Sequence, residues 1–130
     1  MRTVARLSDH DRADVIRIAA ADAGLPDAVM EKDYWVCYAL DHLFHGCDFK
    51  DRLVFKGGTS LSKAYGLIDR FSEDIDLILD WRLLGYGIDE PWQVRTNNKQ
   101  DSFNKETVER TDTFLAEEFV PKLRASMSAD

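Results

Sequence analysis

Two aspartates and a pair of glycines are the residues of this chain whose spacing could do chemistry. Asp74 and Asp76 alternate with apolar residues, and Gly57 and Gly58 follow an apolar stretch that ends near Phe55. Aspartates two positions apart on a strand share one face, with Cα atoms roughly 7 Å apart, and can bind one divalent cation. Adjacent glycines let the backbone turn through positive φ and approach a ligand closely. The combination favours metal-assisted phosphoryl or nucleotidyl transfer.

Three consecutive elements must position these residues. Apolar residues from Leu53 to Phe55 predict a strand that ends at the glycine turn. Thr59 and Ser60 suit the N-cap or first turn of a short helix, whose free N–H groups and hydroxyls can bind a phosphate oxygen. A second strand is then predicted to carry Asp74, Asp76 and Ile78 on one face and Ile75, Leu77 and Leu79 on the other.

Each feature also has a structural interpretation. A Gly-Gly pair after a strand is often only a tight turn, and alternating acidic and apolar residues are ordinary in a half-buried strand. Lys63 could bind a phosphate as a point charge or be a solvated helix lysine. Arg70 could steady phosphates or acceptor, or form a loop salt bridge with Asp69 or Glu73. The order of turn, helix and acidic strand favours the functional interpretation.

Two blocks of sequence carry a family resemblance. Residues 57–63, Gly-Gly-Thr-Ser-Leu-Ser-Lys, and residues 70–77, Arg-Phe-Ser-Glu-Asp-Ile-Asp-Leu, resemble the nucleotidyltransferases of the AbiEii/AbiGii toxin family. The segment 31–36, Glu-Lys-Asp-Tyr-Trp-Val, is similar to that family's upstream signature. The resemblance spans roughly residues 26–80.

The resemblance implies a DNA polymerase β-like nucleotidyltransferase fold and a toxin role in a bacterial toxin–antitoxin or phage-defence system. It implies an NTP substrate, Mg²⁺ or Mn²⁺, an RNA or protein acceptor and a cognate antitoxin. By matching positions, the metal ligands and catalytic residues would be Asp74 and Asp76. The nucleotide-binding candidates are Gly57, Gly58, Thr59, Ser60, Lys63 and Arg70.

The pattern departs from the family after Leu79. Such enzymes normally carry a third carboxylate on a later strand, but here Asp89 and Glu90 precede Pro91, which disfavours a strand interior. We therefore expect the N-terminal part of the family, incomplete at its C-terminus. Two alternatives stay open: a catalytically incomplete nucleotide-binding fragment, or a module that docks an antitoxin or another partner.

Composition agrees with one compact domain. The chain has 130 residues, 45% of them hydrophobic, and a net charge of −7, which argues against a broad nucleic-acid-binding face. Cys37 and Cys47 are too few for a disulfide scaffold and indicate a reducing cytoplasm. No apolar run reaches membrane-spanning length, so we expect no membrane association.

The expected fold class is α/β (α+β), a single nucleotidyltransferase-like domain over residues 1–130 with a small mixed sheet flanked by helices. N-terminal helices are expected within 8–45, bounded by Ser8, Gly24 and Pro26. The strand-turn-helix-strand core spans 52–80, a loop 82–100 and a C-terminal helix 101–125. His42 and His45 lack a second ligand pair for zinc, so a solvent-exposed helix end is expected there.

Overall fold

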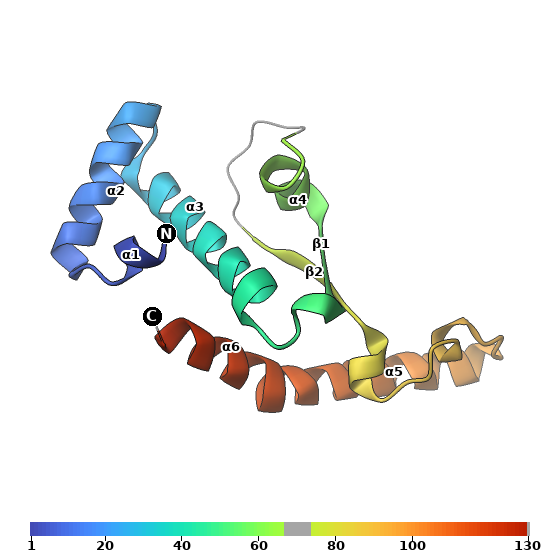
Figure 1. Ribbon diagram of the computed structural model, residues 1–130. Coiled ribbons are helices and arrows are strands. Elements are labelled where there is room, and N and C mark those ends of the chain that lie inside the picture. Colours follow the sequence, from blue (N-terminus) through green and yellow to red (C-terminus); the bar gives the residue numbers. More distant parts are fainter. Residues whose placement is uncertain (67–73, 130) are drawn as a thin grey trace.

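A computed structural model describes residues 1–66 and 74–129. The chain is mostly helical with one small sheet (Figure 1). A long C-terminal helical segment, residues 97–128, runs along one side of the molecule. The helices are α1 (Arg2–Ala5), α2 (Asp9–Ala23), α3 (Asp27–Asp41), α4 (Gly57–Lys63), α5 (Asn97–Phe114) and α6 (Val120–Ser128). The strands are β1 (Leu53–Lys56) and β2 (Asp76–Leu79).

Both ends of α2 and the start of α3 lie where the sequence predicts them. The Ser8 side chain accepts a hydrogen bond from the backbone N–H of Asp11, which caps α2. Gly24 ends α2 in the left-handed conformation with φ of 69°, and Pro26 precedes the first residue of α3. These boundaries are confirmed because each is set by a local capping residue.

The sheet is a two-stranded antiparallel pair, where the sequence analysis expected a small mixed sheet. Leu53 pairs with Leu79, and Lys56 pairs with Asp76 at the other end. The expected alternation of side chains is confirmed, because Val54 and Ile78 form an exposed cross-strand pair. The opposite face packs on the core through partly buried side chains that include Leu77 and Leu79.

A π-helical turn joins α5 to α6 into one long helix. This turn spans Leu115–Phe119, and Pro121 lies in the first turn of α6. Proline has no N–H to donate, so a widened turn accommodates it where a regular helix would kink. The extra residue in the turn also brings Phe114 and Phe119 to the same side of the helix, where both contact Phe49. Pro121 therefore lies within the long helix.

The core gathers around these phenylalanines. Ring centroids of Phe49 lie 5.2 Å from Phe114 and 5.8 Å from Phe119, which are edge-to-face and stacked contacts. Phe49 comes from the connector before β1, so the connector contributes to the core as well as joining elements. The buried members of the cluster are Leu43, Cys47, Phe49, Leu53, Phe114 and Phe119.

A second π-helical turn, His42–Gly46, ends α3 and docks α6. His42 is almost completely buried, with its Nδ1 2.9 Å from the Oγ of Ser126. The Tyr38 ring packs edge-on against His42, and its hydroxyl donates to the carbonyl of Met127. The expected solvent-exposed helix end is thus wrong for His42, because α6 covers it. His45 is exposed, as expected, and lies 3.1 Å from Asp41.

The predicted loop 82–100 is more ordered than its polar sequence suggested. Short 3-10 turns occupy Trp81–Leu84 and Glu90–Trp92, and α5 begins at Asn97, four residues before the predicted start at 101. Tyr86 is buried against α5, and its hydroxyl lies 3.0 Å from the Oγ1 of Thr107. The first turns of α5 are exposed and polar, so they carry no apolar periodicity.

Among the described residues, no helix is long and apolar enough to cross a membrane.

Candidate active site

The glycine pair lies at the junction of β1 and α4. The sequence analysis placed a turn at Gly57 and Gly58 with the helix starting at Thr59, but the helix already starts at Gly57. Gly57 has φ of 78°, a conformation that L-residues adopt only at a cost, so the turn is made by this one residue. Lys56 is at the N-cap position, and Thr59 and Ser60 fall inside the first helical turn.

Asp76 lies directly against Gly57. A Cβ placed on Gly57 would collide with Oδ2 of Asp76 and lie 3.0 Å from its Cγ. The absence of a side chain at Gly57 is therefore what lets the carboxylate approach the backbone here. Asp76 is exposed, is the first residue of β2 and pairs with Lys56. The glycine turn and one candidate metal ligand thus form a single exposed feature.

Asp74 precedes β2, where the sequence analysis placed it within the strand. Its carbonyl oxygen accepts a hydrogen bond of 2.8 Å from the hydroxyl of Thr59, and its Oδ1 lies 3.5 Å from the same hydroxyl. Thr59 is buried, and its hydroxyl joins α4 to Asp74, two residues before β2. Ser60 is buried as well. Burial of both residues limits the access of a phosphate to the hydroxyls that the sequence analysis offered as donors.

Lys63 is engaged by a carboxylate from a distant helix. Its ammonium lies 2.5 Å from Oδ1 and 2.6 Å from Oδ2 of Asp33 in α3. Burial by itself lowers the pKa of Lys63, but the hydrogen bond that Lys63 donates to Asp33 and the nearby Cys37 raise the pKa above its ordinary value. Burial raises the pKa of the Cys37 thiol, and the positive charge of Lys63 lowers it by less. Lys63 is therefore a charged lysine held by Asp33.

The contact of Asp33 with Lys63 was missed, although the family signature favoured a place for Lys32 or Asp33 at the border of the site over a merely charged helix face. Asp33 lies in the upstream segment 31–36, and its spacing from Lys63 along the chain gives no sign of the contact. The only available signal was an acidic residue beside aromatic residues in a segment that matched a family signature. Arg70 lies outside the described residues.

The donor set at this site suits Mg²⁺ bound together with a substrate. Asp74 and Asp76 supply hard carboxylate oxygens, and Mg²⁺ is usually held by one or two carboxylates, waters and substrate phosphates. Among residues 1–66 and 74–129, no group of three or more His, Cys, Asp or Glu side chains gathers where it could hold a metal ion. The described pair fits a cation that arrives with its nucleotide.

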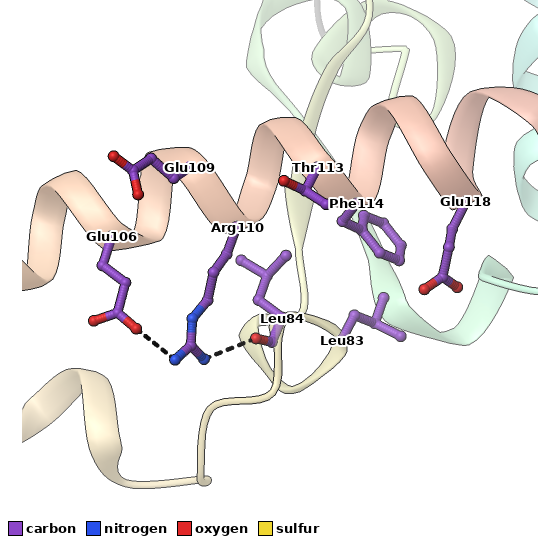
Figure 2. Close-up of a pocket in the computed structure, with 8 residues that line it drawn as sticks. All are labelled: Leu83, Leu84, Glu106, Glu109, Arg110, Thr113, Phe114 and Glu118. Carbon is purple, nitrogen blue, oxygen red and sulfur yellow. Dashed lines mark hydrogen bonds and ion pairs between the residues drawn. The ribbon is translucent and has the colours of Figure 1, made fainter.

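A separate groove lies between α5 and the turn after β2 (Figure 2). It has a volume of about 530 Å³ and is lined by Leu83, Leu84 and Phe114 together with several charged side chains of α5. Arg110 donates to the carbonyl of Leu84 and contacts Glu106, so its charge is already paired. None of the candidate nucleotide or metal residues that the structure describes lines this groove.

Comparison with known proteins identified one family. The model of the family described as "Nucleotidyl transferase AbiEii toxin, Type IV TA system" matches residues 39–129. Comparisons with curated proteins and with solved structures found no match.

Proposed function

Because the chain belongs to the AbiEii family of nucleotidyl transferase toxins of type IV toxin–antitoxin systems, we propose that it binds an NTP and transfers a nucleotide to an RNA or protein acceptor. The family match confirms the resemblance drawn from the two sequence blocks. The observation that most supports the activity is the contact of the Asp76 carboxylate with the backbone of Gly57. It joins a turn suited to a phosphate with an acid suited to a metal.

In this proposal the two aspartates bind the metal that accompanies the triphosphate. Asp74 and Asp76 would hold Mg²⁺ or Mn²⁺, which when bound neutralises charge on the transferring phosphoryl group and helps ionise the acceptor hydroxyl. Asp76 has its place in β2, opposite Lys56. Asp74 is held through its carbonyl by Thr59. Each carboxylate is thus positioned by a different element.

The nucleotide would lie along the glycine turn. The backbone of Gly57 and Gly58 is accessible because neither residue has a side chain, and Gly57 is exposed. Ser60 and Arg70 stay candidates through their family positions. We assign Thr59 and Lys63 a supporting part instead, because one is bonded to Asp74 and the other to Asp33. A cognate antitoxin is proposed as a partner on the family name alone.

The test is transfer of labelled nucleotide from each NTP to total RNA and total protein. Because the sequence predicts no third carboxylate on a later strand, we expect slow transfer by the wild type, and a further fall of at least about a hundredfold with Asp76→Ala, since the metal ligand is lost. The matched control is Asp89→Ala, which removes the same charge from an exposed position in the segment after β2. Asp89→Ala should leave transfer unchanged.

Two outcomes would count against the proposal. Undiminished transfer by a folded Asp76→Ala variant would remove Asp76 from the site. Failure of the wild type to bind any NTP would remove the nucleotidyltransferase assignment. NTP binding without transfer to either acceptor would instead support a nucleotide-binding module that does not turn over.

A further inference from the structure

Helix α4 presents the glycine turn to Asp76, yet it buries almost no apolar surface. It has seven residues, and among the described residues no side chain caps its N-terminus. Its buried residues are Thr59 and Ser60, whereas Leu61 is 42% exposed. A helix this short is not stable alone in water. Its position must therefore depend on polar contacts with neighbouring elements.

Polar contacts between described residues tie α4 to neighbouring elements near each of its ends. Near its start, the Thr59 hydroxyl donates to the carbonyl oxygen of Asp74 over 2.8 Å. At its last residue, the Lys63 ammonium donates to Oδ2 of Asp33 over 2.6 Å and lies 2.5 Å from Oδ1, which has no hydrogen-bond partner among the described residues. The side chains of Lys63 and Asp33 are only 24% and 14% exposed, so solvent screens this ion pair less than a surface pair. Removing either partner would leave the other charge partly buried and unpaired.

We propose that Asp33 is a positioning residue, which holds α4 through Lys63 and so keeps the glycine turn facing Asp76. This inference rests on the proposed function, because the turn matters only if it receives a nucleotide. It gives the upstream segment 31–36 a physical role that the sequence blocks alone did not supply. In this proposal the Lys63 ammonium positions α4 through Asp33 and does not bind phosphate.

The two roles of Lys63 can be separated with single and double variants. If Lys63 only carries the restraint from Asp33, then Asp33→Asn and Lys63→Met should weaken NTP binding equally, and the double variant should be no worse than either. Misplacement of a reacting group by about 1 Å can lower a reaction rate ~10²-fold. We expect the effect on binding to be smaller, so that each single variant raises the NTP Kd at least about tenfold. If Lys63 bound phosphate directly, Lys63→Met alone would have this effect.

The measurements are calorimetric NTP titration, with Mg²⁺, and amide hydrogen exchange over residues 57–63. The matched control is Glu31→Gln, which removes an exposed carboxylate two residues away on a different side of α3. Asp33→Asn should accelerate exchange in α4 while α2 keeps wild-type protection, and Glu31→Gln should do neither. Wild-type NTP affinity together with unchanged exchange in Asp33→Asn would overturn the proposal.

The exchange experiment also separates this proposal from the proposed function. If wild-type protein binds no NTP, the nucleotidyltransferase assignment fails, yet faster exchange of α4 in Asp33→Asn would still show that Asp33 holds this helix. If Asp33→Asn does not fold, Asp33→Glu and Lys63→Arg take its place, because both keep the charges but alter the reach of the pair. Faster exchange of α4 in these variants supports the restraint, and unchanged exchange in both refutes it.

Discussion

Substitution of Gly57 by alanine tests the closest contact in the candidate site. The backbone φ of 78° costs an L-residue about 1–2 kcal/mol relative to glycine. The new Cβ would also collide with the carboxylate of Asp76 and lie 3.1 Å from the Cβ of Asp76. Asp76 is exposed, so its side chain can rotate away for roughly 0.5–1.5 kcal/mol. We therefore expect Gly57→Ala to lower the free energy of unfolding by about 1.5–3.5 kcal/mol.

Gly24→Ala is the matched control. Gly24 has a φ of 69°, but a Cβ there would meet nothing within 4 Å. It therefore carries the backbone cost, about 1–2 kcal/mol, without the collision. The difference between the two variants measures the contact with Asp76. Urea unfolding followed by circular dichroism gives both values at one temperature.

A double variant isolates the contact further. Asp76→Ala removes the carboxylate, so Gly57→Ala should cost about 1 kcal/mol less in that background than in the wild type. NTP and metal binding should be lost in the folded Gly57→Ala variant and kept in Gly24→Ala. Equal destabilisation by both glycine variants, with no coupling to Asp76→Ala, would refute the close approach of Asp76 to Gly57.

Three further predictions use other contacts. The hydrogen bond from Arg82 holds the pKa of the Asp80 carboxyl well below its usual value, so the stability that this carboxylate contributes is present above pH ~4 and lost on further acidification. The free energy of unfolding, measured from pH 7 to pH 2, should therefore depend less on pH in Asp80→Asn. Mn²⁺ or Mg²⁺ should raise the Tm of the wild type but not of an Asp74→Asn/Asp76→Asn variant, and an equal response in both would exclude this pair as the metal site. Phe49→Ala should lower the free energy of unfolding by about 3–5 kcal/mol in a denaturant titration, because it empties the centre of the aromatic core, and a loss under 1 kcal/mol would contradict that packing.

Local signals predicted the parts of the fold that are set locally. Ser8 and Gly24 bound α2 because a cap and a left-handed glycine act within a few residues of the helix end. The alternation of β2 was also predictable, because a strand with one covered face must place apolar side chains at every second position. The order of strand, short helix and second strand around the glycine pair was also predicted, although Asp74 lies before β2 and not within it.

Contacts between distant segments were not predictable in this way. Phe49 reads as part of a connector, and its place in the core depends on Phe114 and Phe119, more than sixty positions away. The position of His42 in the sequence indicates an exposed helix end, but in the structure α6 covers it and Ser126 contacts its ring. The same holds for Lys63, whose partner Asp33 is thirty residues upstream. A pattern of residue types reports the face a side chain occupies, but it does not report which element lies opposite that face.

The two aspartates of the candidate site therefore differ in what holds them. Asp76 is fixed by the ladder of β1 and β2, and its neighbour across that ladder is Lys56, the residue before the turn. Asp74 lies outside the ladder and is tied to α4 by the Thr59 hydroxyl. The contact of α4 with Asp74 thus reaches the residue through its backbone carbonyl. Since α4 has little apolar packing, the proposed restraint of α4 by Lys63 and Asp33 would also act on Asp74, and through it on the proposed metal site.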